Sequence, residues 1–320
     1  MGERRASVVI PTRAGARRLP VLLTALAAQS VRAEVVVVVD GDVDGSADVV
    51  TGWADRLDLR VVVLPENRGR SAALNAGFEA ATGEVLLRCD DDLDPGPEHV
   101  ARHLSHHDDR ADTDPPAGVV GLCRNVFPDT AYAAAYGRPR DAAFARTAYG
   151  MVPDQRWRLW GANVSVTRAT WEKVGRYDEA FRAYGWEDVD WGYRLHRLGA
   201  EVVLDPALEA RHLGAPTTTV ARAERAYLSG AARRAFEAKH PDAALPPPLG
   251  ATAWDRLVGG AARTLGPRGL AVAARLADRA AGSLPDYLAE KSVALVVEGA
   301  AAAGHRRGAG SSWAGRTDAV

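Results

Sequence analysis

The first half of the chain alternates short, fully apolar runs with segments in which apolar residues recur every three or four positions. Runs of the first kind predict buried strands, and segments of the second kind predict helices that bury one face. The predicted strands are residues 7–10, 34–39, 59–64 and 85–89, and the predicted helices are residues 17–29, 47–57 and 71–82. Apolar strands that alternate with helices are typical of a mostly parallel α/β sheet with helices on both faces.

The second half of the chain has a less regular pattern. It predicts helices over 98–107, 168–174, 185–198 and 220–240, and strands over 119–126, 159–166 and 201–204. Residues 128–156 mix scattered aromatic residues with glycine and proline, and we expect them to form a mobile excursion. Pro246-Pro247-Pro248 marks a linker. The Ala/Arg/Gly-rich residues beyond it predict a helical extension.

The composition narrows the classes of function. The formal net charge is −1, so no global basic field favours a nucleic-acid partner. The two cysteines, Cys89 and Cys123, give neither a disulfide framework nor a zinc-ligand spacing. The N-terminus lacks the apolar core of a signal peptide, and no apolar run approaches the ~20 residues that span a bilayer. We therefore expect a cytoplasmic protein without a transmembrane segment.

Three turns that follow predicted strands carry polar residues. They are Pro11-Thr12-Arg13, Asp40-Gly41-Asp42 and Asp90-Asp91-Asp92. Ligands of parallel sheets bind at the carboxyl ends of the strands, so we expect these turns to face one crevice. Adjacent aspartates repel one another unless a cation is near, and carboxylate oxygens suit a hard divalent metal. The alternative from these residues alone is a solvated acidic turn or a helix cap.

The helix predicted over 71–82 begins in a segment that contains Arg68, Gly69, Arg70 and Asn75. Gly69 permits a tight turn, and the two arginines are close enough to the helix start to bind phosphate oxygens. The segment matches neither a Walker A loop nor a Gly-x-Gly-x-x-Gly fingerprint. From these residues alone, solvated arginines at a helix start are the favoured interpretation.

A second acidic cluster, Glu187 and Asp188, lies among aromatic residues in the segment 184–194. Acidic residues in a first helical turn are favoured by the helix dipole, which is the structural interpretation. A carboxylate among apolar rings also has its pKa raised, which suits a general base, and aromatic faces stack on sugar rings. His212 follows the last predicted strand region, and it becomes a candidate nitrogen ligand if the fold returns it to Asp90–Asp92.

Taken in order, these motifs resemble family 2 glycosyltransferases, which are inverting enzymes of the GT-A fold. The similarity runs from Ser7 to Leu213. The segment from Gly161 to Asp190 resembles the galactosyltransferase-type C-terminal half of that family. The family pattern at the second strand end is Asp-Asp-Gly-Ser, whereas this chain has Asp40-Gly41-Asp42-Val43-Asp44-Gly45-Ser46, which resembles that pattern with an insertion. Whether Asp40 or Asp42 contacts the base is therefore left open.

The resemblance implies a role for each matched position. Asp188 matches the catalytic base, and Glu187 would orient the acceptor. The cofactor would be Mn²⁺ or Mg²⁺, held by Asp92, His212 and Asp90. The implied donor-binding residues are Pro11, Thr12, Arg13, Asp40, Asp42, Arg68, Arg70, Asn75, Asp90 and Asp91. The implied acceptor-binding residues are Trp160, Gly161, Tyr184, Trp186 and Trp191.

The resemblance also implies a domain organisation. We expect a glycosyltransferase domain over residues 1–245, with a nucleotide-binding half over 1–127 and an acceptor-binding, catalytic half over 128–245. A linker and helical extension over 246–303 and a disordered tail over 304–320 would follow.

The implied function is transfer of a sugar from a nucleotide-sugar donor, with a UDP-sugar favoured, to an acceptor hydroxyl by metal-assisted single displacement. The acceptor would be a carbohydrate, a lipid-linked compound or a small molecule, and we expect no nucleic-acid partner. Two alternatives are a sugar-nucleotide pyrophosphorylase and a non-catalytic carbohydrate-binding relative. The expected location is the cytoplasm, and peripheral attachment to the inner membrane surface is left open.

Overall fold

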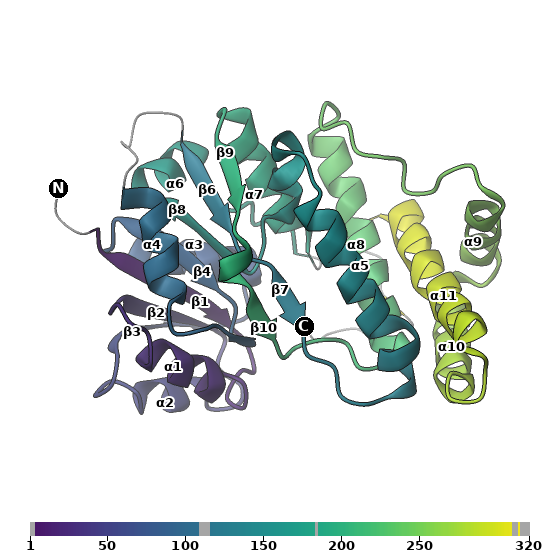
Figure 1. Ribbon diagram of the computed structural model, residues 1–320, viewed down its shortest axis with the longest axis horizontal. Helices are drawn as coiled ribbons and strands as arrows, with labels where there is room; N and C mark the ends of the chain where they lie inside the picture. Colours follow the sequence, from purple (N-terminus) through teal and green to yellow (C-terminus); the bar gives the residue numbers. More distant parts are fainter. Residues whose placement is uncertain (1–3, 109–115, 183–184, 309–312, 314–320) are drawn as a thin grey trace. The chain divides into compact units, whose positions relative to one another are not determined.

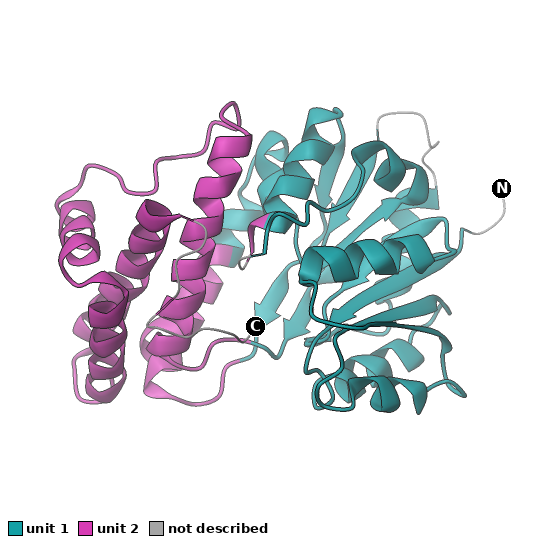
Figure 2. Ribbon diagram, turned by 180° about the vertical axis from the view of Figure 1, so that it is seen from behind, with its two compact units in different colours: residues 1–126, 145–182, 187–214 teal, residues 127–144, 183–186, 215–320 magenta. Residues whose placement is uncertain are grey.

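The computed structural model describes residues 4–108, 116–182, 185–308 and 313 (Figure 1). The chain forms two compact units (Figure 2). Unit 1 comprises residues 1–126, 145–182 and 187–214, and unit 2 comprises residues 127–144, 183–186 and 215–320. The helical unit thus begins earlier than the boundary that we expected after residue 245. Gly304–Arg307 are helical instead of disordered, and most of the rest of the expected tail lies outside the described residues.

Unit 1 is built on a seven-stranded sheet with the order β3-β2-β1-β4-β8-β6-β9. Its strands are β1 (Ala6–Thr12), β2 (Glu34–Asp40), β3 (Asp58–Leu64), β4 (Val85–Cys89), β6 (Ala117–Val120), β8 (Asn163–Thr167) and β9 (Glu201–Leu204). Strands β1 to β4 are parallel, as the sequence predicted. Strand β8 is antiparallel to both of its neighbours, β4 and β6, so the sheet is mostly parallel.

Helices cover both faces of the central strands because alternate side chains point to opposite faces. The helices of the first half are α1 (Leu19–Ala27), α2 (Ser46–Thr51), α3 (Arg70–Ala80) and α4 (His99–Asp108). The buried face of α1 packs on a cluster that includes Val8, Val37 and Leu87. Helix α3 packs on the other face, where a Cβ on Gly77 would lie 2.4 Å from a methyl group of Val9.

A second, three-stranded sheet consists of β5 (Leu93–Asp94), β10 (Ala210–His212) and β7 (Cys123–Asn125), with β10 in the middle. The sequence predicted one strand over 119–126, and this prediction is wrong because the chain leaves the large sheet after Val120. Gly121 still donates its N–H to Asn163, whereas the carbonyl of Leu122 already accepts from Ala210 of the small sheet. Because the chain changes sheets here, Asn125 on β7 pairs in register with His212 on β10.

The segment expected to be a mobile excursion is helical. It contains the π-helix η1 (Ala133–Gly137), helix α5 (Arg138–Tyr149) and the 3₁₀-helix η2 (Pro153–Leu159). Alanine is the best helix former, and its repeated use in residues 131–148 outweighs the scattered glycine and proline. The rest of unit 1 contains α6 (Arg168–Val174), α7 (Trp186–Arg197), whose first residue belongs to unit 2, and η3 (Pro206–Leu208).

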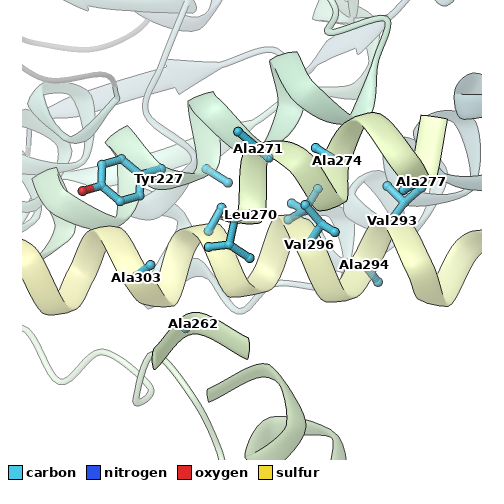
Figure 3. Close-up of a cluster of buried hydrophobic side chains, with 14 of the residues drawn as sticks. Tyr227, Ala262, Leu270, Ala271, Ala274, Ala277, Val293, Ala294, Val296 and Ala303 are labelled. Carbon is cyan, nitrogen blue, oxygen red and sulfur yellow. The ribbon is translucent and has the colours of Figure 1, made fainter. Parts of the chain in front are cut away.

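Unit 2 is helical, with α8 (Thr219–Lys239), α9 (Ala253–Thr264), α10 (Gly266–Ala280) and α11 (Asp286–Arg307). Helix α11 packs along α8 and also contacts α9 and α10, around a core that includes Tyr227 and Leu270 (Figure 3). A Cβ on Gly304 would lie 1.9 Å from the carbonyl oxygen of Tyr227, so glycine permits this close approach. Among the helices in the described ranges, none combines the length and the apolar content needed to cross a membrane.

Helix α4 carries a buried stripe of histidines at four-residue spacing, His99, His103 and His107. His103 lies 3.0 Å from Oδ1 of Asn163 through Nε2 and 2.8 Å from Oγ of Ser165 through Nδ1. Because the amide oxygen only accepts, Nε2 carries the proton and Nδ1 accepts from the Ser165 hydroxyl. Ser165 Oγ is then free to accept from Nε2 of His107, 2.9 Å away. The chain of hydrogen bonds is complete with neutral rings.

Burial lowers the pKa of His99 from 6.5 to about 4 and also lowers the pKa of His103. Between the unfolded and folded pKa values the unfolded chain binds more protons, so acid favours unfolding. We predict that the denaturant midpoint of unit 1 falls as the pH is lowered from 6.5 towards 4, and that His99→Phe makes this dependence shallower.

The measurement is urea denaturation followed by tryptophan fluorescence at several pH values. His196→Phe is the control, because it removes a half-exposed imidazole from the same unit. An unchanged pH slope in His99→Phe would contradict the assignment of the effect to the buried stripe.

Candidate active site

Asp92 and His212 lie close to each other where β10 of the small sheet ends. Strand β10 pairs with β5 so that His212 is the register partner of Leu93, and the N–H of Leu213 donates to the carbonyl of Asp92 at 2.8 Å. This backbone pairing brings Nε2 of His212 to 3.1 Å from Oδ2 of Asp92. Burial opposes ionisation of Asp92, but while His212 is protonated its hydrogen bond and charge outweigh burial and lower the pKa of Asp92.

The hydrogen bonds of His212 decide which of its nitrogens faces Asp92 as an acceptor. Nδ1 lies 2.7 Å from Oδ1 of Asn125, and an amide oxygen only accepts, so Nδ1 carries the proton of the neutral ring. Nε2 then turns its lone pair towards a carboxylate, an arrangement that a cation between the two groups satisfies. Imidazole and carboxylate are both ligands of divalent ions such as Mn²⁺, and a second hydrogen bond that orients the histidine is usual at metal sites.

Asp90, the third residue that the resemblance assigned to the metal, is held by a buried arginine. Nε of Arg88 donates to Oδ1 of Asp90 at 2.7 Å, and Nη2 donates to Oδ2 at 3.1 Å. Both carboxylate oxygens are thereby engaged, so we leave Asp90 out of the cation pair. Within the described ranges, no three His, Cys, Asp or Glu side chains are gathered as metal ligands. The donor set of Asp92 and His212 therefore fits a divalent ion that takes its further ligands from bound substrate or water.

Helix α7 brings two buried carboxylates to two guanidinium groups, one each. Nη1 of Arg88 contacts Oδ1 of Asp188, and Nη1 of Arg70 on α3 lies 3.3 Å from Oε1 of Glu187. Burial raises the pKa of Asp188 to about 7, against the lowering effect of Arg88. A carboxyl group that titrates near neutral pH is suited to accept a proton, which is the role predicted for Asp188.

Asp91 and Thr12, two predicted donor-binding residues, contact each other. The hydroxyl of Thr12 donates to Oδ2 of Asp91 at 2.5 Å, and Arg18 donates to both carboxylate oxygens. Asp91 is buried, and its pKa is raised by burial against the opposing hydrogen bonds of Arg18 and Thr12. These contacts tie the end of β1 to the acidic turn, which is a structural role.

The two aspartates of the second strand end also accept from the main chain. Asp40 is buried and accepts the N–H groups of Arg68 and Gly69 at 2.7 and 2.9 Å, so it fixes the start of α3. Asp42 is exposed and accepts the N–H groups at the start of α2, including that of Gly45. Neighbouring Pro11 is buried in β1, and Arg13 donates to the carbonyl of Asp40 at 2.9 Å.

Asn75, another predicted donor-binding residue, is fully buried. Its amide donates to the carbonyl of Tyr177 at 3.0 Å and to Glu179 at 3.1 Å, and its Oδ1 accepts from the N–H of Tyr177. Asn75 therefore holds the loop before α7 instead of offering groups to a ligand. Arg68 is half-exposed and pairs with Glu179 at 3.2 Å.

Trp160 and Trp191, predicted to bind the acceptor, are only 4% and 1% exposed. Their rings stack with centroids 4.9 Å apart, and Tyr177 stacks on Trp191 at 5.6 Å. Nε1 of Trp160 also donates to the hydroxyl of Tyr177 at 3.1 Å. These rings form an interior stack, so they do not offer the exposed sugar-binding face that we expected.

The remaining predicted acceptor residues are not gathered with that stack. Trp186 packs inside unit 2, where its Nε1 donates to Ser229 at 3.1 Å and its ring lies 5.1 Å from that of Phe236. Gly161 lies half-buried in the turn before β8. Tyr184 lies outside the described residues.

Sequence reasoning missed Arg88, Asn125 and Tyr177 as parts of the site. Arg88 carried the clearest signal, because a charged residue inside an apolar strand is almost never fully buried unless it is paired. Asn125 had no signal, since its role depends on the pairing of β7 with β10.

The geometry of unit 1 agrees with what known proteins show. A family model described as glycosyl transferase family 2 matches residues 7–179. The chain belongs to this family. Its mostly parallel sheet and helical C-terminal region confirm the predicted GT-A-like fold class, although the galactosyltransferase type of the second half is not part of that match.

Curated relatives include a validoxylamine A glucosyltransferase from Streptomyces hygroscopicus, 31% identical over 237 residues, which cover 64% of this chain and 55% of that protein. Another is an undecaprenyl-phosphate 4-deoxy-4-formamido-L-arabinose transferase from Pseudomonas fluorescens, 32% identical over 184 residues, with 56% and 46% covered. The chain spans about half the length of the curated relatives it matches.

Solved structures show the same fold. The mannosyltransferase PcManGT from Pyrobaculum calidifontis, in complex with GDP-Man and Mn²⁺, matches with a TM-score of 0.63 and 21% identity over 95% of this chain and 88% of that one. Residues 1–349 of S. aureus TarS in complex with UDP match with a TM-score of 0.51 and 16% identity, covering 92% and 90%.

The close approach of the chain at Gly214 provides a test of the Asp92–His212 pair. A Cβ at this position would lie 1.9 Å from Oδ2 of Asp92 and 3.2 Å from Nε2 of His212. We predict that Gly214→Ala displaces the Asp92 carboxylate and weakens Mn²⁺ binding in the presence of UDP or GDP at least tenfold, while the protein remains folded.

Mn²⁺ binding is followed by electron paramagnetic resonance, and folding by circular dichroism. Gly96→Ala is the matched control, because a Cβ at Gly96 meets no atom within 4 Å. Equal Mn²⁺ affinity of Gly214→Ala and the wild type would exclude the pair as a cation site.

Proposed function

We propose that the protein is an inverting glycosyltransferase that moves a sugar from a nucleoside-diphosphate sugar to an acceptor hydroxyl, with Asp188 as the base. The observation that supports this most directly is the guanidinium of Arg88, which contacts Asp90 at the end of β4 and Asp188 at the start of α7. A single side chain thus holds the donor-side carboxylate and the candidate base close to each other, which is consistent with a displacement at one sugar carbon.

In the proposed step, the acceptor oxygen attacks the anomeric carbon while Asp188 takes the hydroxyl proton. The new carbon–oxygen bond forms as the bond to the diphosphate oxygen breaks, and the electron pair leaves with the nucleoside diphosphate. One base opposite the leaving group suffices for a single displacement, and the anomeric configuration inverts. No second carboxylate nucleophile is needed, in contrast to retaining glycosidases. Glu187, held by Arg70, would orient the acceptor.

Asp92 and His212 would hold the divalent cation, with Asn125 orienting the imidazole. Such a cation, when bound, neutralises the charge that develops on a leaving diphosphate. PcManGT, which shares the fold, was solved with GDP-Man and Mn²⁺, and this supports Mn²⁺ as the first ion to test.

The nucleotide sugars to be tested as donors, called the donor panel, are chosen from the names of the relatives. Their names include a glucosyltransferase and a mannosyltransferase, and the resemblance of residues 161–190 adds galactose, so we propose a hexose donor and test UDP-glucose, UDP-galactose and GDP-mannose. A transferase named for undecaprenyl phosphate supports a lipid-linked acceptor as one candidate beside carbohydrates. A preferred donor stabilises the fold by mass action, so the largest thermal shift with Mn²⁺ identifies it.

We predict that Asp188→Asn binds the preferred donor with wild-type affinity but transfers the sugar about 10² to 10⁴ times more slowly. The amide keeps the shape of the side chain but does not accept the acceptor proton. The measurement is Mn²⁺-dependent release of the nucleoside diphosphate, with water or an added acceptor as the nucleophile.

Asp190→Asn is the control for this variant. Asp190 is a buried carboxylate of the same helix that pairs with Arg194 at 3.0 Å, so its loss should lower stability but leave transfer intact. Wild-type transfer by Asp188→Asn would exclude Asp188 as the base.

We further predict that Asp92→Ala abolishes Mn²⁺-dependent nucleotide binding, because it removes the carboxylate from the cation pair. Asp94→Ala is the matched control two residues away, where the carboxylate pairs with the exposed Arg211 instead. Calorimetric titration with UDP or GDP, with and without EDTA, measures the effect. Binding that survives both EDTA and Asp92→Ala would show that the metal role is wrong.

A further inference from the structure

Arg88 is a full positive charge inside a strand that otherwise belongs to the core. Strand β4 turns Val85, Leu87 and Cys89 towards the apolar cluster under α1. Arg88 points to the opposite face of the sheet, where its side chain is completely buried. Burial of an isolated guanidinium is strongly unfavourable, so opposite charges must compensate it there.

Two carboxylates compensate the charge of Arg88, and they do so unequally. Asp90 receives two hydrogen bonds, from Nε at 2.7 Å and from Nη2 at 3.1 Å. Asp188 receives the contact with Nη1. The fork of donors on an arginine can serve two acceptors at once, whereas the single ammonium of a lysine would have to divide its contacts. Asp90 and Asp188 therefore compete for one cation.

The other charged and titratable groups that act on Asp188 come from every element packed against it. They are Arg88 on β4, Asp90 directly after β4, Arg70 on α3, Cys123 on β7, Glu187 on α7 and Tyr177 in the loop before α7. Burial, Glu187 and Asp90 oppose ionisation of Asp188, while Arg88 and Arg70 favour it. Arg88 is the cation in direct contact, so its removal should leave Asp188 protonated near neutral pH.

We propose that Arg88 is a positioning residue that keeps Asp188 ionised and aimed for proton transfer, and that Asp90 limits this effect by sharing the guanidinium. The inference deepens the proposed function and rests on it. Arg88 and Asp90 together set the lower limit of the pH range in which the enzyme works.

Substitutions of Arg88 and of Asp90 should shift the acid limb of the pH–rate profile in opposite directions. Arg88→Gln removes the cation, so the acid limb of the pH–rate profile should move at least one pH unit upwards, with the rate recovered in alkaline buffer. Asp90→Asn leaves Asp188 as the carboxylate that Arg88 compensates, so the acid limb of the pH–rate profile should move to lower pH. Arg88→Lys keeps the charge and should retain the wild-type limb with a lower maximal rate.

The measurement is Mn²⁺-dependent release of UDP from UDP-glucose, or of the diphosphate from whichever panel donor is preferred, between pH 5 and 9 at saturating donor. Arg168→Gln is the structural control: this arginine bonds the carbonyls of Gly83 and Ala81 beside the start of β4 and does not touch Asp188. It should reduce stability without moving the limb.

The outcomes separate this inference from the proposed function. A folded Arg88→Gln with the wild-type limb would overturn the inference, and so would an Asp90→Asn limb that stays or moves upwards. If Arg88→Gln does not fold by circular dichroism, the Asp90→Asn shift decides alone. Asp188→Asn is assayed in parallel: if it keeps both the activity and the acid limb, the base assignment fails, whereas an inactive Asp188→Asn leaves the base assignment standing whatever Arg88 does.

Discussion

The insertion of β10 between β5 and β7 is the interaction on which the rest of the candidate site depends. The pairing is short, yet it is secured towards both neighbouring strands, because Leu213 donates to Asp92 and Val126 donates to His212 through the main chain. It brings His212 to Asp92 although the two residues are 120 positions apart. Backbone pairing thus fixes the separation of these side chains, and neither has to be held in place by a flexible loop.

A second constraint is the confinement of charge at the end of β4. Arg88 needs partners because it is buried, and Asp188 and Glu187 need cations for the same reason. The least costly arrangement gathers these groups on one face of the strand, with Arg70 supplying the second cation. The opposite face of β4 stays apolar and packs under α1. Strand β4 thereby carries apolar core residues on one face and the charged Arg88 on the other.

The sequence predicted the first four strands closely, because each is a short apolar run with a helix after it, and this pattern does not depend on distant contacts. It also predicted that the acidic turns lie at strand ends. The direction of β8 and the division of 119–126 between two sheets could not be read in this way, since both depend on which strands become neighbours. The packing of α8 on α11 could not be read for a similar reason, because α8 resembles any amphipathic helix until its neighbour is known.

The sequence predicted which residues gather at the candidate site better than it predicted what each of them contacts. Asp92 and His212 do meet, and Asp188 does lie in an environment that raises its pKa. Trp160 and Trp191 were expected at the surface, but ring exposure is decided by tertiary packing that local spacing does not encode. Asn75 is polar and near a helix start, yet its hydrogen bonds join two parts of the chain.

The side chain of Asn163 has a consequence for how this fold varies among relatives. Its Nδ2 donates to the carbonyl of Leu208, and its Oδ1 accepts from His103, which is linked in turn to Ser165. An aspartate would set a carboxylate against the Leu208 carbonyl, and a leucine would leave both partners without a hydrogen bond. Positions 103, 163 and 165 should therefore change together or not at all, so that covariation among them would mark the subset of the family that shares this buried chain of hydrogen bonds.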